Sequence, residues 1–226
     1  MNCLRSILAA GLASLVLFPA LVRAQNTGEA TGARGSKNVR SLKEIRDEGV
    51  VKQRWDVSCG AAALSTLLTY DFKDDTTETS IVVWLLHRVD ATRVRSRGGF
   101  SLLDLKHFSE ARGYHAEAFS GMTIQDLAQE KTSVIVPIRE KGFDHFVVVK
   151  GIVAGHVILG DPGFGNITMR VDRFQTLWKN GIVFVVHPPD DRMIGDKRLP
   201  LAARLVPDES LISRKIGVTA PSNYLY

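Results

Sequence analysis

The sequence predicts an α+β fold, in which N-terminal helices pack on a C-terminal antiparallel β-sheet. Alanine- and leucine-rich segments preceded by helix-capping residues fill the first half of the chain. Short β-branched runs separated by Gly, Pro, Asp and Asn fill the second half. Because the strands follow the helices instead of alternating with them, an antiparallel sheet is favoured over a parallel one.

The first 24 residues are predicted to be a secretory signal peptide. Arg5 supplies a positive charge, residues 6–21 form an apolar run, and Val22 and Ala24 are small residues where a signal peptidase binds them. The alternative is an N-terminal membrane anchor. It is disfavoured because the apolar run is shorter than the roughly 18 consecutive apolar residues that a membrane-spanning helix requires. We expect cleavage near Ala24 and a periplasmic or secreted protein.

The remaining chain is predicted to contain one domain. Residues 25–40 are rich in Gly, Thr and charge and are expected to form a flexible leader. The domain is expected over residues 41–188, since about 200 residues suffice for one sizeable core. Residues 189–226 are polar and contain proline, and we expect an extension that wraps the domain or is partly disordered.

Composition excludes several function classes. The net charge is +5, with 45% hydrophobic and 23% charged residues, and no stripe of Lys and Arg with interleaved aromatics is present. Nucleic acid is therefore not an expected partner. Neither GxxxxGK[ST] nor GxGxxG occurs, so no ATP or dinucleotide site is expected, and we expect no cofactor.

The mature protein is expected to contain a single cysteine. The chain has two cysteines, Cys3 and Cys59, and Cys3 leaves with the predicted signal peptide. The mature protein then has no partner for a disulfide within the chain. A single thiol in an oxidising compartment is either buried and inert or reactive and used.

Capping residues mark the expected helices. Ser41 with Glu44 forms a capping box for a helix over residues 42–47, which Gly49 ends. Ser58 is expected to cap a buried helix that begins at Cys59 and continues through Leu68. Further helices are expected over 79–89, over 102–112 after the cap Ser101, and from Thr123 to Glu130. Strands are expected over 133–138, 145–152, 156–159, 167–171 and 182–187.

Cys59 is the candidate nucleophile. It stands at the predicted start of a helix, where free amides and the helix dipole favour a thiolate and an oxyanion. Gly60 leaves the approach to the thiol open, and Gln53 precedes it by six positions on an extended segment, 50–55, from which its amide could donate to an oxyanion. A small buried hydrophobic residue is the alternative interpretation of Cys59.

Among the six histidines, His145 is the candidate base. It begins the predicted strand 145–152, and a hairpin centred on Val153 would place it directly opposite Asp161. Opposed residues have Cβ atoms about 4.5–5.5 Å apart, so the carboxylate could orient the imidazole. Alone, His145 is also compatible with a structural strand residue and Asp161 with a turn former before a proline. His156 would lie at the turn without such a partner.

A zinc site made of Cys59, His145 and Asp161 is the metal-binding alternative. It is disfavoured because no C-x-x-C, H-x-x-x-H or HExxH spacing is present, and we expect no metal.

Three blocks of the sequence resemble the C39 bacteriocin-processing peptidase family. They are Gln53 to Leu64 (QRWDVSCGAAAL), His145 to Val149 (HFVVV) and Asp161-Pro162, in the family's order within residues 50–186. The resemblance implies a papain-like cysteine peptidase fold, with Cys59, His145 and Asp161 as the catalytic triad and Gln53 in the oxyanion hole. Transporter-linked members cut after a Gly-Gly pair and usually have Asp where this chain has Ser58. Neither their membrane spans nor their ATPase is seen here, so we do not extend that specificity to this chain.

The segments Gly98 to Leu105 and Asp161 to Gly165 resemble stand-alone, exported members of the family. Those members include proteins that accompany functional-amyloid (Fap) secretion systems, which implies a peptide or protein substrate such as an amyloid-fibre subunit or a secretion-system component. The expected function is peptide-bond hydrolysis in an extended substrate, and Trp55 is expected either to wall a substrate subsite or to lie in the core. A non-catalytic peptide-binding or chaperone module with the same cleft is the alternative, and acyl transfer to an amine is a third.

Overall fold

The computed structural model describes residues 40–190, and the predicted signal peptide, most of the predicted leader and nearly all of the C-terminal extension lie outside that range. Helices α1 (Leu42–Asp47), α2 (Cys59–Thr66) and the π-helical turn η1 (Leu67–Asp71) come first, followed by α3 (Glu78–Leu86), α4 (Ala91–Ser96) and α5 (Leu102–Ala111). No helix within residues 40–190 is long and apolar enough to cross a membrane.

The second half forms one antiparallel sheet of six strands. These are β1 (His115–Phe119), β2 (Val134–Glu140), β3 (Phe143–Val153), β4 (His156–Asp161), β5 (Gly165–Arg170) and β6 (Val183–His187), in the order β1-β6-β2-β3-β4-β5. The short helices α6 (Ile124–Gln129) and α7 (Val171–Leu177) interrupt the strands. The α+β architecture is therefore as predicted, with helices first and most strands afterwards.

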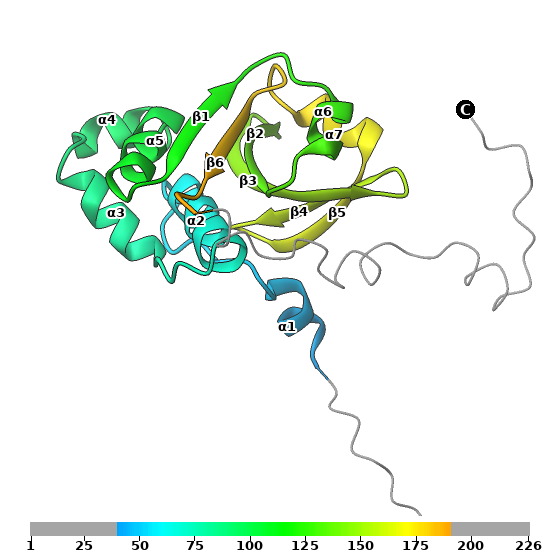
Figure 1. Ribbon diagram of the computed structural model, residues 1–226, viewed down its shortest axis with the longest axis horizontal. Helices are drawn as coiled ribbons and strands as arrows, with labels where there is room; N and C mark the ends of the chain where they lie inside the picture. The colour runs from blue at the N-terminus through cyan, green and yellow to red at the C-terminus, as the bar shows by residue number, and fades with distance from the viewer. Residues whose placement is uncertain (1–39, 191–226) are drawn as a thin grey trace, which may run out of the picture. The chain divides into compact units, whose positions relative to one another are not determined.

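Both faces of the sheet are covered. Side chains such as Val148 and Phe184 face the core that α2, α3 and α5 share, whereas Val147 and Val185 face a second core under α6 and α7. Figure 1 shows α3, α4 and α5 gathered on one side of β1 and β6, with α6 and α7 on the other side. Alternate strand residues point to opposite faces, so covering both faces explains why β2 begins with five consecutive buried residues.

Capping predicted several helix starts correctly. Ser41, Ser101 and Thr123 each accept a hydrogen bond from the backbone N–H three residues on, and each forms a capping box. Two short helices were not predicted, α4 and α7, and Val171 begins α7 instead of ending strand β5. The third predicted helix is shifted, since Thr77 caps α3 at Glu78 and the helix ends at Leu86.

The hairpin of β3 and β4 has a different register from the predicted one. Its turn is Ala154-Gly155, with both residues at positive φ, and a bulge at Lys150 shifts the pairing. Beyond the bulge Val148 pairs with Gly160, so continuing the ladder places Asp161 opposite Val147. The prediction that Asp161 directly faces His145 is therefore wrong by two residues.

Candidate functional site

His145 and Asp161 nevertheless meet. Nε2 of His145 lies 3.0 Å from Oδ1 of Asp161, and their side chains are 23% and 5% exposed. Residues two positions apart on a strand share a face, so His145 is a diagonal neighbour of Asp161 across the hairpin. Diagonal neighbours are about 7–8 Å apart, a gap that an imidazole and a carboxylate can bridge.

The carboxylate of Asp161 is held by its own turn. Its Oδ1 accepts the backbone N–H of Gly163 at 2.7 Å and that of Phe164 at 3.1 Å, besides the hydrogen bond from His145. Burial raises the pKa of this carboxyl group, but the hydrogen bonds from His145 and from the two backbone amides outweigh it, and the net pKa is lowered. Asp161 is therefore an anion at neutral pH, fixed in direction against the imidazole.

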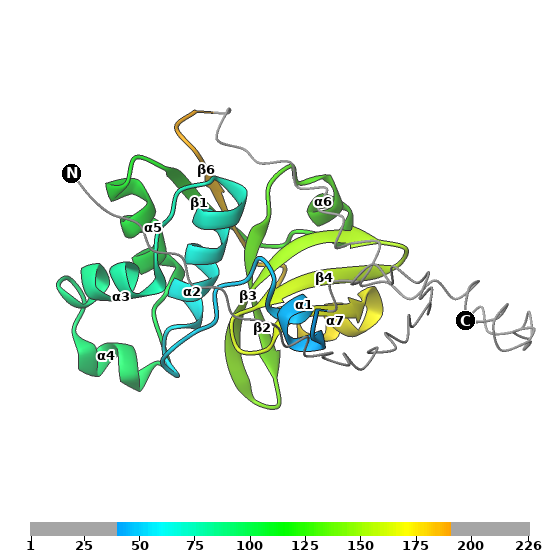
Figure 2. The ribbon, with the colours of Figure 1, turned by 90° about the horizontal axis from the view of Figure 1, so that it is seen from below.

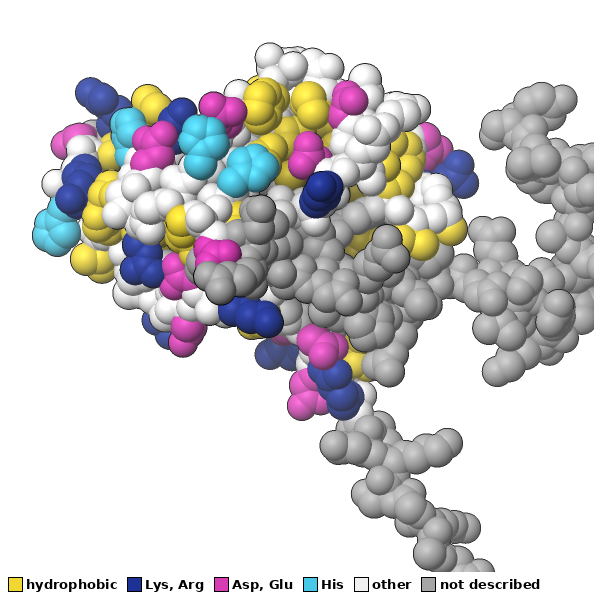
Figure 3. Space-filling model, in the orientation of Figure 1, with side chains coloured by type: hydrophobic (Ala, Val, Ile, Leu, Met, Phe, Trp, Pro, Cys, Tyr) yellow, Lys and Arg dark blue, Asp and Glu magenta, His cyan; other side chains and the backbone are white. Residues whose placement is uncertain are grey.

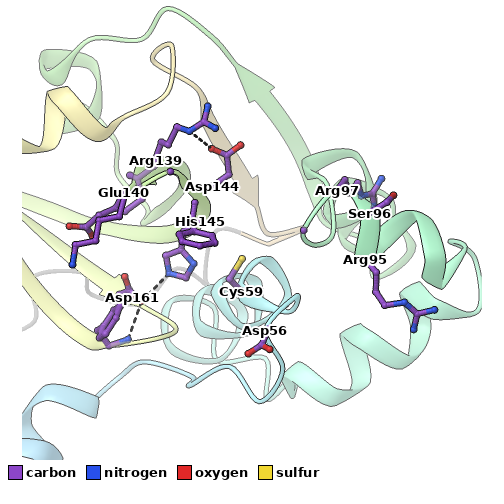
Figure 4. A pocket seen from close by; sticks show the side chains of 16 residues that line it. Asp56, Cys59, Arg95, Ser96, Arg97, Arg139, Glu140, Asp144, His145 and Asp161 are labelled. Atoms are coloured by element: carbon purple, nitrogen blue, oxygen red, sulfur yellow. Dashed lines mark hydrogen bonds and ion pairs between the residues drawn. The ribbon is translucent and has the colours of Figure 1, made fainter.

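Cys59 completes the arrangement from the helical side. Figure 4 shows its sulfur at the start of α2 pointing to the His145 ring, with Asp161 beyond the ring. The thiol is close enough to the imidazole to raise the pKa of the ring. Since Nε2 of the ring is bonded to Asp161, Nδ1 is the nitrogen that remains for Cys59. The structure thus brings together the three residues that the sequence singled out.

The protonation state of His145 follows from these neighbours. Burial of the imidazole lowers its pKa, whereas the hydrogen bonds and charges of Asp161 and Cys59 raise it, and the net pKa is about 9. At neutral pH the ring is therefore an imidazolium between two groups that favour its positive charge. An imidazolium beside a thiol stabilises the thiolate, which is the nucleophilic form.

Close packing between α2 and β3 makes this contact possible. A Cβ on Gly60 would lie 3.2 Å from Cδ2 of Phe146 and 3.3 Å from Cδ1 of Leu105. Gly60 therefore faces the interior and lets the helix approach the strand beside His145. The expectation that Gly60 opens the approach to the thiol is wrong, because its missing side chain would point into the core.

Ser58 does not cap α2 with its side chain, contrary to the prediction. Its Oγ lies 2.5 Å from Oε1 of Glu78 and 2.7 Å from the carbonyl oxygen of Trp55, and Ser58 and Glu78 are both buried. The first amides of α2 thus receive no side-chain acceptor from Ser58. Free amides at this position are suited to hold a negatively charged oxygen next to the thiol.

Glu78 supports the segment that leads to Cys59 and was not predicted as a residue of the site. Its Oε1 accepts the backbone N–H of Arg54 at 3.0 Å as well as the hydrogen bond of Ser58. Glu78 is 3% exposed and is the first residue of α3. In the sequence a glutamate after a capping threonine is typical of any helix start, so no local signal distinguished it.

Gln53 lies near the site but outside the wall of its cavity. Its backbone N–H donates to Pro162 O at 2.9 Å, and its Nε2 donates to Trp55 O at 3.0 Å. Its Oε1 is buried without a hydrogen-bond partner. Because an amide NH₂ group has two hydrogens, one donor remains beyond the bond to Trp55.

The thiol and the imidazole open on a cavity of about 810 Å³. One wall comes from the start of α2 and from α4, and the other from the β2–β3 hairpin and the β4–β5 turn. The residues that line it include Asp56, Cys59, Arg95, Phe143, His145 and Phe164. In Figure 2 the β2–β3 hairpin projects from the body on the same side as α4.

Charges on the cavity wall are mixed in sign. Asp144 pairs with Lys179 at 2.7 Å and with Arg139 at 3.6 Å, and Arg97 pairs with Asp104. The face of the molecule in Figure 3 likewise shows basic and acidic side chains interspersed. Within residues 40–190, no three His, Cys, Asp or Glu side chains are grouped so that they could hold a metal ion.

Trp55 borders a different cavity. Its side chain is 44% exposed, so it does not lie in the core, and it lines a second cavity of about 650 Å³ between the 54–58 segment, α3 and α4. Asp56 and Arg95 line both cavities, which therefore adjoin. Trp55 does not wall the cavity that contains Cys59, and its part in binding substrate stays a prediction.

Comparison with known proteins gives consistent matches. Residues 47–191 match the model of the peptidase C39 family. Two curated relatives, named probable functional amyloid protease FapD, from Pseudomonas fluorescens and Pseudomonas aeruginosa PAO1, are each 37% identical to this chain over 150 residues. The match covers 66% of this chain and 65% of each relative.

A solved structure confirms the predicted fold class. The peptidase domain of Streptococcus ComA, a bifunctional ABC transporter involved in a quorum-sensing pathway, superposes with a TM-score of 0.52 at 21% identity. The superposition covers 62% of this chain and 97% of that domain. At this identity the likeness shows the fold alone, which is the predicted papain-like arrangement of helices and sheet.

Proposed function

Because this chain belongs to the peptidase C39 family, we propose that it is an exported cysteine endopeptidase in which Cys59, His145 and Asp161 form the catalytic triad. One arrangement supports the proposal above all others. The His145 ring lies between the Cys59 thiol and the Asp161 carboxylate, with 3.0 Å between Nε2 and Oδ1. A nucleophile bonded to a base that a third group orients is the general signature of covalent catalysis.

The first half of the proposed reaction is acylation. The Cys59 thiolate attacks the carbonyl carbon of the scissile peptide bond and forms a carbon–sulfur bond. The remaining N–H of Gln53 Nε2 and the backbone amide of Cys59 donate to the oxyanion. As the carbon–nitrogen bond breaks, the imidazolium of His145 gives its Nδ1 proton to the leaving amine, which departs as the new N-terminus.

The second half is hydrolysis of the thioester. Neutral His145 now takes a proton from a water molecule, and the hydroxide attacks the acyl carbon. The carbon–sulfur bond breaks, the carboxylic acid leaves and loses its proton to solvent, and the thiolate–imidazolium pair is restored. Throughout, Asp161 holds the ring and stabilises its positive charge.

The substrate class follows from the family and the relatives. We propose an extended peptide or secreted-protein substrate. The name of the two relatives, probable functional amyloid protease, supports an amyloid-fibre subunit, and a secretion-system component is the other candidate. The periplasm, or the exterior after secretion, is the proposed location, since residues 1–24 have the pattern expected of a secretory signal peptide.

Alkylation of Cys59 tests the proposal without a known substrate. Protein lacking residues 1–24 is treated with iodoacetamide at pH 7, and the labelling rate is compared in wild type and His145→Ala. We expect at least tenfold slower labelling in the variant, because the thiolate loses its imidazolium. His156→Ala is the matched control, since that ring bonds to Ala154 O in the β3–β4 turn.

Equal and slow labelling of wild type and His145→Ala would contradict the proposal. That result would favour the alternative function, a module that binds an extended peptide without cutting it. For the natural substrate, we propose mass spectrometry of the peptides released by cells that produce wild type or Cys59→Ala. Peptides that disappear only with Cys59→Ala identify the cleaved protein.

A further inference from the structure

Two phenylalanine rings are exposed at the rim of the cavity that contains Cys59 and His145. Phe143 is 78% exposed and Phe164 is 64% exposed, and both line that cavity. They are the most exposed aromatic residues within residues 40–190. Single apolar side chains on a surface are ordinary, but two at one rim give a ligand an apolar surface to contact.

The structure fixes Phe143 relative to His145. Phe143 is the first residue of β3, two positions before His145, and pairs with Glu140 of β2. Lys141 and Gly142 form the two-residue turn between them, both at positive φ as a tight hairpin requires. Since alternate residues of a strand project to one face, the Phe143 side chain stands on the same face as the imidazole.

Phe164 is tied to the same pair from the other side. Its backbone N–H donates at 3.1 Å to Oδ1 of Asp161, the oxygen that also accepts the hydrogen bond of His145. The β4–β5 turn therefore fixes the backbone of Phe164 beside the His145–Asp161 pair. Both phenylalanines thus start from backbone positions that are set relative to this pair, and both line the same cavity as the pair.

The reaction defines which part of a substrate passes these rings. In the proposed mechanism His145 protonates the leaving amine, so the residue that follows the scissile bond lies against the His145 side of the cavity. The acyl part lies on the opposite side, where the segment before α2 contributes Asp56 and α4 contributes Arg95. The exposed rings thus belong to the half of the cavity that holds the leaving segment.

We propose that Phe143 and Phe164 form a subsite for a bulky apolar side chain on the residue directly after the scissile bond. The inference rests on the proposed function and adds to it a substrate class, peptides with Leu, Ile, Met or Phe at that position. An apolar contact of this kind changes the ratio of kcat/KM between two competing substrates by about 10- to 200-fold.

A peptide library tests the subsite. Peptides from a digested bacterial lysate are amine-blocked and incubated with wild type or with the double variant Phe143→Ala/Phe164→Ala, and the new N-termini are identified by mass spectrometry. We expect apolar residues to be enriched at the first position of the new N-termini with wild type and not with the double variant. Phe119→Ala is the control, since Phe119 lies on β1, is 44% exposed and does not line the cavity. Cuts without this enrichment, or enrichment that survives in the double variant, would overturn the subsite.

Protection of Cys59 from iodoacetamide gives a second readout that needs no turnover. Phenylalaninamide resembles the leaving residue with its free amine, and glycinamide lacks the apolar side chain. We expect phenylalaninamide to slow alkylation of wild type at least fivefold more than glycinamide does, and this difference to vanish in Phe143→Ala/Phe164→Ala. Equal protection by the two amides would disprove the subsite while leaving the proposed function intact. Labelling that does not depend on His145 would instead remove the proposed function itself.

Discussion

Ser58 and Glu78 are joined by a 2.5 Å hydrogen bond between two buried side chains, directly before the residue that bears the thiol. The same oxygen of Glu78 accepts the backbone N–H of Arg54. The turn that leads into α2 is thus anchored to the first residue of α3, twenty positions further along the chain. A carboxylate in the place of the Ser58 hydroxyl would therefore stand directly against the carboxyl group of Glu78.

Ser58→Asp should therefore destabilise the protein. The substitution places a second carboxylate against Glu78 in a buried position, where like charges are costly. We expect a loss of about 3 kcal/mol in the free energy of unfolding at pH 7, compared with about 1 kcal/mol for Ser58→Ala, which removes the hydroxyl's hydrogen bonds to Glu78 and Trp55 without adding a charge. Urea denaturation of the three proteins measures the difference.

A double variant separates charge repulsion from loss of packing. Ser58→Asp/Glu78→Gln should recover most of the loss, because one of the two charges is gone. A single variant as stable as wild type at pH 7 would mean that Glu78 does not restrict this position.

Asp161→Asn should lower the pKa of His145 without dismantling the turn. The amide oxygen can still accept the backbone N–H groups of Gly163 and Phe164, but the negative charge beside the imidazole is lost. We expect the pKa of His145 to fall by at least about one unit from about 9, measured by NMR titration of its ring protons. Asp144→Asn is the matched control, a carboxylate on the same cavity that pairs with Lys179 instead. An unchanged titration of His145 would contradict the role of Asp161.

Gln53→Ala should slow the reaction more than it weakens binding. Loss of one oxyanion donor typically costs about 100- to 1000-fold in kcat. We expect KM for a peptide cleaved by wild type to change no more than about threefold, because the donor acts on the charge that develops during the reaction. Gln129→Ala on α6 is the control for a glutamine lost elsewhere. A rise in KM at unchanged kcat would instead assign Gln53 to ground-state binding.

Sequence predicted the parts of the fold that depend on neighbouring residues. The capping boxes at Ser41, Ser101 and Thr123 each close within one helical turn, so their local pattern sufficed. Helix α4 has a single buried residue, Val94, and α7 has only Phe174, so neither shows an apolar period. Those two helices depend on the tertiary structure that surrounds them.

The proximity of the three candidate residues was predicted, but the register that brings them together was not. Cys59, His145 and Asp161 were identified from residue types and order, and the structure brings them together. The register was wrong because the bulge at Lys150 and the position of the Ala154-Gly155 turn have no unique signature in the sequence. The interior direction of Gly60 and the bond between Ser58 and Glu78 depend on partners far along the chain, which local patterns do not contain.

The raised pKa of His145 predicts a pH dependence of stability. Burial lowers this pKa, while Asp161 and Cys59 raise it to about 9, against 6.5 for an ordinary histidine. Between these two pH values the folded protein holds a proton that the unfolded chain has released. The stabilisation is therefore complete below pH 6.5 and is lost as the pH rises through 9.

The size of the effect is about 3 kcal/mol, from about 1.4 kcal/mol for each unit of pKa difference. The quantity to compare is the difference in free energy of unfolding between wild type and His145→Asn. We expect this difference to be about 3 kcal/mol larger at pH 6 than at pH 9.5. Lys150, whose pKa burial lowers to about 8, titrates in both proteins and cancels in the comparison. Urea denaturation at the two pH values measures the difference. A difference between the two proteins that does not change with pH would mean that the imidazolium is not held by Asp161 and Cys59, and the thiolate–imidazolium pair would lose its physical basis.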